Sequence, residues 1–143
     1  MSEENVVATF TISGNTPSSK NNRMWTGSSF IPSAYTRRWL RDTKTEWEDQ
    51  RDAFVKALEG LPKPYCIEFT FVRKSRHKFD NINITQGPAD CMKAFGWLED
   101  DNADILKPYY GDYTYDKRNP RLIIKILKQA PNHYDIPSHK TTS

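Results

Sequence analysis

The sequence RKSRHKFDNINITQGPADCMKAFGWLEDDNAD, residues 73–104, decides how the rest of the chain is arranged. It begins with a basic run that leads into Asp80, continues through a short segment with a helical pattern, and ends among acids at Asp100, Asp101 and Asp104. Cations therefore stand beside carboxylates. Hard cations such as Mg²⁺ prefer oxygen ligands, usually a few carboxylates with a substrate phosphate completing the shell. The segment predicts a site that holds phosphates and a divalent metal ion.

This segment is expected to connect a strand to a helix and then to return. Upstream, residues 65–72 (YCIEFTFV) alternate between two kinds of side chain, which predicts a strand covered chiefly on one face. Downstream, residues 85–95 are predicted to be helical, with Pro88 in the first turn, where a proline is tolerated. A helix of this length rises only ~15 Å, so the chain can bring Asp101 back towards Asp80.

Further elements are predicted on both sides of this segment. Residues 6–12 (VVATFTI) read as a strand, and a polar loop over residues 13–23 follows it. Residues 33–58 read as a helix that Ser33 caps. Its apolar stripe is expected to consist of Leu40, Trp47 and Phe54, which recur every seven residues, and of Leu58 four residues further on. Residues 107–127 predict two strands joined as a hairpin through the turn DKRNP.

The chain of 143 residues has the size of one domain. We expect an α+β fold, a small mixed β-sheet flanked by two helices, over residues 1–128, and a flexible polar tail over residues 129–143. Cys66 and Cys91 have neither a C-x-x-C nor a zinc-like spacing, which indicates reduced packing residues. The sequence has no secretory leader pattern and no apolar run approaching ~20 residues, so we expect a soluble, intracellular protein without a membrane partner.

The distribution of charge is more informative than the net charge of +3. One basic cluster is formed by Arg37, Arg38 and Arg41, near the start of the predicted helix, where cations oppose the helix dipole. This cluster either faces a phosphate backbone or is a solvated helix face. Lys20 and Asn21 belong either to a plain surface loop or to a basic arm that contacts DNA phosphates and bases.

The central segment resembles the RusA family of Holliday junction resolvases, which are small Mg²⁺-dependent endonucleases common in phages and prophages. In that family a strand runs into D-x-D-N-x-x-K, a helix carries another Asp seven residues after the Asn, and G-x-x-x-D-D follows. Residues 17–21 (PSSKN) also resemble the family's P-S-K-N with one extra serine. Aligned without gaps, the family's acids and asparagine fall on Asp80, Asn83, Asp90, Asp100 and Asp101.

The chain departs from the family pattern at two positions. Ile82 stands where the family has its second acid, and Gln86 stands where it has its catalytic lysine. Matching Asp80 and Asn81 to the family's D-N pair restores that dipeptide, but it places Lys78 on the first acid and requires an insertion of two residues further on.

In the ungapped alignment, Asp90 or Asn83 would take the role of the missing ligand. Lys78 or His77 would supply the missing positive charge. These replacements are hypotheses, because the sequence alone does not place the side chains in space.

The resemblance implies a homodimeric endonuclease that cleaves branched DNA, such as Holliday junctions, in the cytoplasm of a bacterial host. It implies Mg²⁺ as the cofactor, with Mn²⁺ able to substitute. The catalytic residues would be Asp80, Asp100 and Asp101. The metal would be held by Asp80, Asp101, Asp100, Asp90 and Asn83. DNA would be bound by Lys20, Asn21, Arg73, Lys74, Arg76 and Lys78. Two alternatives remain: a weakened or inactive RusA-like DNA-binding protein, and a nuclease that acts on other branched DNA.

Overall fold

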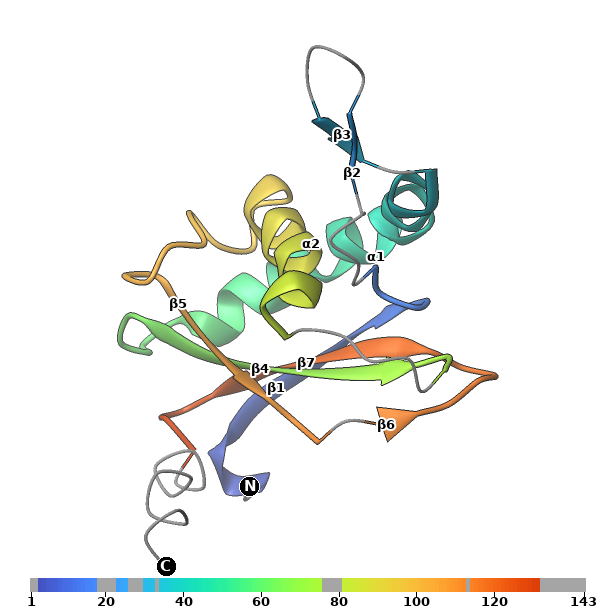
Figure 1. Cartoon of the computed structure of the whole chain (residues 1–143). Coiled ribbons are helices and arrows are strands. Elements are labelled where there is room, and N and C mark those ends of the chain that lie inside the picture. The colour runs from blue at the N-terminus through green and yellow to red at the C-terminus, as the bar shows by residue number, and fades with distance from the viewer. Residues whose placement is uncertain are drawn as a thin grey trace, which may run out of the picture.

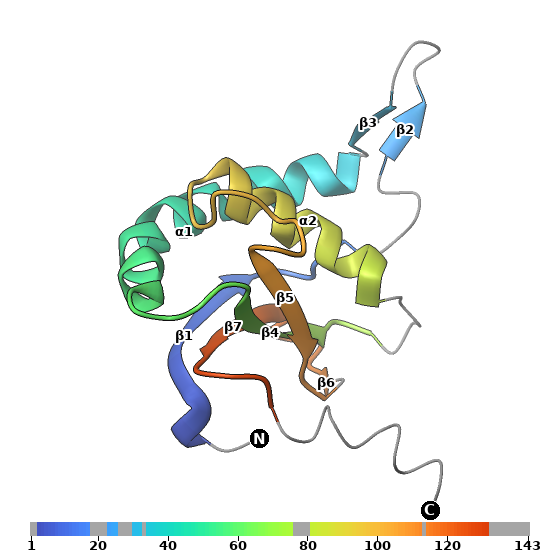
Figure 2. The ribbon, with the colours of Figure 1, turned by 90° about the vertical axis from the view of Figure 1, so that its left-hand side faces the viewer.

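A computed structural model describes residues 3–17, 23–25, 30–32, 34–75, 81–112 and 114–131. The predicted α+β class is confirmed, since a mixed sheet of five strands is covered on one face by two helices (Figures 1 and 2). In chain order the elements are η1 (Glu3–Asn5), β1 (Val6–Ser13), β2 (Arg23–Trp25), β3 (Phe30–Pro32), α1 (Ala34–Leu58), β4 (Tyr65–Arg73), α2 (Asn81–Ala94), β5 (Leu106–Tyr110), β6 (Thr114–Tyr115) and β7 (Arg121–Leu127).

The sheet has the strand order β1-β7-β4-β5, and β6 pairs with the far end of β4. The strand β7 is antiparallel to both β1 and β4, whereas β5 and β6 run parallel to β4. The predicted hairpin is therefore wrong, because β7 is inserted between β1 and β4 and does not pair with β5 or β6. Its side chains explain this position: Leu122, Ile124 and Ile126 have no exposed surface, and a central strand removes such side chains from water best.

The core between the sheet and the helices is largely aromatic. Trp97, from the segment after α2, lies with its ring centroid 4.5 Å from that of Phe54 and 4.9 Å from that of Trp47, both on α1. Its indole N–H donates a 2.7 Å hydrogen bond to the Trp47 carbonyl oxygen. The predicted apolar stripe of α1 is confirmed at these positions and at Leu58, while Trp39 joins it in place of the half-buried Leu40.

The helix α2 begins at Asn81, four residues before the predicted start. Pro88 consequently lies in the interior of the helix and not in its first turn, which corrects the prediction. Because proline has no N–H, the Ile84 carbonyl receives no helical hydrogen bond from it. Ile84 and Met92 are completely buried, so the packing of this helix against the sheet offsets the missing bond.

Side chains of α1 form hydrogen bonds with the backbone along part of the outer edge of β1. Gln50 donates to the Thr11 carbonyl oxygen at 3.1 Å, and the Ser13 backbone N–H donates to the Glu46 carboxylate at 2.7 Å. Neither helix in the described part of the chain is long and apolar enough to cross a membrane.

The sequence prediction also differs from the structure after β1 and at the start of the predicted C-terminal tail. The short hairpin of β2 and β3 was not predicted, and it follows the polar loop, of which residues 18–22 lie outside the described residues. At the start of the predicted tail, Asn5 holds the chain, since its backbone carbonyl accepts from Lys128 and its side chain donates to the Gln129 carbonyl. Residues 132–143 of that tail are outside the described residues.

Candidate functional site

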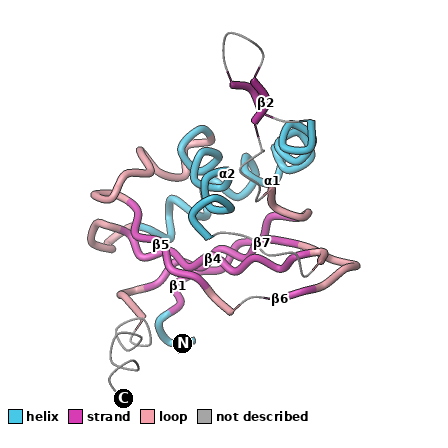
Figure 3. Tube along the Cα trace, in the orientation of Figure 1, coloured by secondary structure: helices cyan, strands magenta, loops and turns pink. Residues whose placement is uncertain are grey.

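The predicted site residues fall into two described groups. Asp90 lies on α2 and Asp100 and Asp101 lie in the loop between α2 and β5 (Figure 3). Arg73 and Lys74 lie at the end of β4. The remaining predicted side chains are outside the described part of the structure: Lys20, Asn21, Arg76, His77, Lys78, Asp80 and Asn83.

The acidic loop is fixed at its start by the end of α2. Gly96 adopts φ +78°, a left-handed conformation that ends the helix at low steric cost because glycine has no Cβ. The backbone N–H groups of Trp97 and Leu98 then both donate to the Met92 carbonyl oxygen, at 2.8 and 3.1 Å. Since Trp97 is also anchored in the core, the loop that follows it starts from a fixed position.

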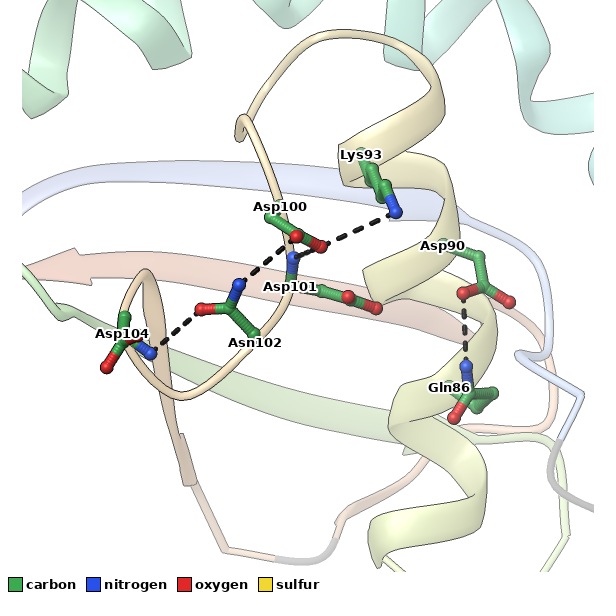
Figure 4. A network of polar contacts seen from close by, with 7 residues as sticks. All are labelled: Gln86, Asp90, Lys93, Asp100, Asp101, Asn102 and Asp104. Atoms are coloured by element: carbon green, nitrogen blue, oxygen red, sulfur yellow. Dashed lines mark hydrogen bonds and ion pairs between the residues drawn. The ribbon is translucent and has the colours of Figure 1, made fainter.

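Asp100 organises this loop. Its Oδ1 accepts from the backbone N–H of Asp101 at 2.8 Å and lies 3.4 Å from the Lys93 ammonium. Its Oδ2 accepts from the Asn102 amide at 3.1 Å (Figure 4). The hydrogen bond from Asp101, and after it the positive charge of Lys93, lower the pKa of the Asp100 carboxyl. Both oxygens of this carboxylate are therefore occupied by protein donors.

Asp101 has a different environment from its neighbour. Its half-buried carboxylate points towards α2 (Figure 4), and among the described residues its close polar neighbour is the Asp100 carboxyl, while no N–H or ammonium donor is seen to reach it. It borders a hollow of about 200 Å³ between α2 and β5, together with Thr85, Gln86 and Tyr110. The hydroxyl of Thr85 lies 3.0 Å from that of Tyr110, to which it donates. Asp101 is thus the open carboxylate of the loop.

The other acids near the loop are less suited to bind a ligand. Asp90 is exposed, and its Oδ1 accepts from the Gln86 amide one helical turn earlier, at 3.0 Å. Asp104 is exposed, and its backbone N–H donates to the Asn102 side chain at 2.9 Å. The structure thus places Asp100 and Asp101 in the loop beside α2 and Asp90 on the helix itself, without gathering the three into one group, while Asp104 forms part of a turn.

The donor set fits a hard cation only in part. Asp101 provides a carboxylate, and Thr85 and Gln86, which border the hollow beside it, carry a hydroxyl and an amide oxygen, all of them oxygen ligands of the kind Mg²⁺ prefers. Among the described residues, however, no group of three or more acids, histidines or cysteines is arranged to hold an ion. A complete metal site therefore requires a further carboxylate, and Asp80 is the predicted one.

The second group, at the end of β4, contains one buried and one exposed cation. Arg73 is 6% exposed and donates to the Thr16 carbonyl oxygen at 3.0 Å, so it holds the loop after β1 in place. Lys74 is exposed, its backbone N–H donates to the Asn15 side chain, and its ammonium lies 5.9 Å from the centre of the Tyr35 ring. Of these two predicted DNA contacts, Lys74 is exposed at the surface and Arg73 is buried.

Sequence reasoning missed three residues of these groups: Lys93, Asn15 and Tyr35. The role of Lys93 could not be predicted, because the lysine lies next to Asp100 only once the loop after α2 has folded back along the helix. The other two stand in a stretch that reads as ordinary loop and helix start, and no spacing in the sequence marks their contact with Lys74. Neither a protein-family model nor a curated protein matches the chain.

Proposed function

We propose that this protein is a Mg²⁺-dependent endonuclease that cleaves branched DNA, as the resemblance of residues 80–101 to the RusA family implies, in the cytoplasm of a bacterial host. The observation that carries the proposal is the open carboxylate of Asp101, which faces α2 and borders the hollow that Thr85 and Gln86 also line (Figure 4). Its neighbour Asp100 is held by protein donors at both oxygens. One acid is thus free to bind a ligand while the other keeps it in place.

The start of α2 supports the pairing of Asp101 with Asp80. Asp80 directly precedes Asn81, the first residue of the helix. Thr85, which borders the same hollow as Asp101, lies four residues further on, and four helical residues rise only ~6 Å. We therefore expect Asp80 to reach the hollow from the start of the helix.

In the proposed reaction Asp80 and Asp101 would hold the ion. Asp100 would position Asp101 by accepting the hydrogen bond from the backbone N–H of Asp101. Bound there, the ion would lower the pKa of a water molecule and stabilise charge on the scissile phosphate. The exposed cation Lys74 would bind phosphates of the DNA arms. Two copies related by a twofold axis would place two such sites for symmetric cuts on a four-way junction.

The test is to incubate the purified protein with a synthetic four-way junction and Mg²⁺ or Mn²⁺. We expect paired, symmetric nicks from the wild type and a loss of rate of at least about 100-fold in Asp101→Asn, with junction binding retained. Asp100→Asn should lose about 10- to 100-fold, because a positioning partner of a ligand is removed. Asp104→Asn is the matched control, since it lies on the same loop, is exposed and should cleave like the wild type.

Titration calorimetry with Mn²⁺ separates loss of metal from loss of fold. Binding heat in the wild type and in Asp104→Asn, but not in Asp101→Asn, supports the proposed site. Tight binding of the junction without any cut in either metal would contradict the enzyme and indicate the non-catalytic DNA-binding alternative. Unpaired cuts would indicate a nuclease for other branched substrates.

A further inference from the structure

Tyr35 is an exposed aromatic residue whose orientation is fixed. The residue is 38% exposed, yet its hydroxyl donates to the Asn15 carbonyl oxygen at 2.5 Å and accepts from the Asn15 amide at 2.9 Å. The same Asn15 side chain accepts the backbone N–H of Lys74 at 2.9 Å. Asn15 thus joins three segments that are distant in the chain, and the ring of Tyr35 is held in one orientation at the surface before any partner binds.

Exposed cations lie near the ring of Tyr35. The Lys74 ammonium lies 5.9 Å from its centroid. Arg38 follows three residues later on α1, which places it beside Tyr35 on the same side of the helix, and it is exposed. Arg37 and Arg41 are exposed on the same turns, and Arg41 is paired with Asp42 at 3.1 Å.

The first turn of α1 contains no acid. A helix start carries partial positive charge and favours anions, and exposed arginines add to that preference. The charges of this end of α1 therefore favour a negatively charged partner.

We infer that Tyr35 stacks on an unpaired base of a nucleic acid, while Arg38 and Lys74 bind the phosphates next to that base. An exposed flat ring with Lys74 over one face and Arg38 close by on the helix fits an unstacked nucleotide, which offers a π-face to the other side of the ring and flanking negative charges. An acidic peptide would use the cations but would leave the exposed ring without a matching surface. The inference extends the proposed function, because a branch point presents such bases, but its contacts are separate from the acidic loop.

Because Tyr35 is pre-oriented, it loses little side-chain freedom on binding. Its replacement by alanine should therefore weaken the binding of a single-stranded oligonucleotide by roughly 5- to 150-fold. The measurement is fluorescence anisotropy with a short labelled thymine oligonucleotide and with the four-way junction, both in EDTA, so that no cleavage occurs. Tyr35→Phe and Asn15→Ala keep the ring but break the hydrogen bonds, and both should retain most of the affinity.

The cations are tested through the dependence of affinity on salt. Arg38→Ala and Lys74→Ala should each make the slope of log K against log salt shallower by about 0.7 for a single strand. Lys56→Ala is the matched charge control: it is exposed on the same helix, but it lies 18 positions after Arg38, a rise of ~27 Å, so its slope should equal that of the wild type.

A second readout tests stacking itself. An oligonucleotide with 2-aminopurine at an unpaired position should lose fluorescence on binding to the wild type and to Tyr35→Phe, but not to Tyr35→Ala. Equal weakening by Tyr35→Phe, Asn15→Ala and Tyr35→Ala would overturn the inference, because the tyrosine would then only hold the loop. Equal affinity of the wild type for polyglutamate would also overturn it and indicate an acidic protein partner.

The inference and the proposed function can fail separately. If Tyr35→Ala binds like the wild type while Asp101→Asn loses cleavage, the stacking platform is wrong and the nuclease stands. If Tyr35→Ala loses binding but the wild type cuts nothing in Mg²⁺ or Mn²⁺, the nuclease is wrong and the binding surface stands.

Discussion

The ammonium of Lys93 lies 3.4 Å from Oδ1 of Asp100, so the helix α2 supplies a counter-charge to the acidic loop that follows it. The same Oδ1 accepts the backbone N–H of Asp101. Two adjacent acids of identical chemistry are thereby distinguished: Asp100 is bound within the protein, and Asp101 is open to the hollow beside α2.

The first prediction concerns the titration of Asp100. Its pKa should lie below the ordinary value of 3.8, and Lys93→Gln should raise it only in part, because the hydrogen bond from the Asp101 backbone is the larger cause. Carbon-detected NMR of the side-chain carboxyl against pH measures this directly. A lowered native pKa stabilises the fold above pH 3.8, and this contribution is lost as pH falls through the native value. Asp100→Asn should remove that part of the acid dependence; a native pKa at or above 3.8 would contradict the prediction.

The second prediction concerns the cysteines, both of which are free thiols. Burial, with a smaller effect from the negative charge of Asp90, raises the pKa of Cys91 to about 12. Since the thiolate is the reactive form, Cys91 should resist iodoacetamide at pH 8, while the half-buried Cys66 is modified first. Mass spectrometry of the wild type and of Cys66→Ser checks this: Cys66→Ser should take up label only after denaturant is added. Rapid labelling of native Cys66→Ser would show that the thiol is accessible.

The third prediction uses a close approach in the sheet. A Cβ on Gly111 would lie 2.1 Å from the Thr70 hydroxyl, so Gly111→Ala should destabilise the fold by about 1–3 kcal/mol through overpacking. Thr70→Ala should recover part of this loss in the double variant, as measured by urea unfolding. Gly60→Ala is the control, because Gly60 has φ +82° and no atom within 4 Å of a Cβ, so its strain should be independent of Thr70. An additive double variant of Gly111 and Thr70 would rule out the clash.

The strands and the long helix could be predicted because the spacing of their apolar residues states which side is buried. The pairing of β7 could not, since a strand of high apolar content such as residues 121–127 suits either a terminal hairpin or the centre of the sheet, and only contacts with β1 decide between them. The start of α2 was misplaced because Pro88 reads as a helix start, whereas the burial of Ile84 extends the helix past that signal.

The sequence predicted which acids belong to the candidate site, but not the different environments of the individual acids. The acids of the loop are visible in the sequence as a cluster, yet nothing in the spacing separates Asp100 from Asp101. The difference arises from the donors that reach Asp100, which are the backbone N–H of Asp101, the Asn102 amide and Lys93 on α2. In the same way Arg73 and Lys74 read as equivalent cations, and only the fold buries Arg73 against the Thr16 carbonyl.

The last prediction connects the aromatic core to the acidic loop. Trp97→Phe removes the donor of the 2.7 Å hydrogen bond to the Trp47 carbonyl and leaves a space among buried rings, so we expect a loss of about 1–3 kcal/mol in the free energy of unfolding. Trp39→Phe is a matched control, because Trp39 is also buried and its indole N–H has no hydrogen-bond partner among the described residues. It should cost less. Because Trp97 anchors the loop, its variant should also speed amide hydrogen exchange at Asp101, whereas Trp39→Phe should not; equal exchange in both variants would show that the loop holds its shape without this anchor.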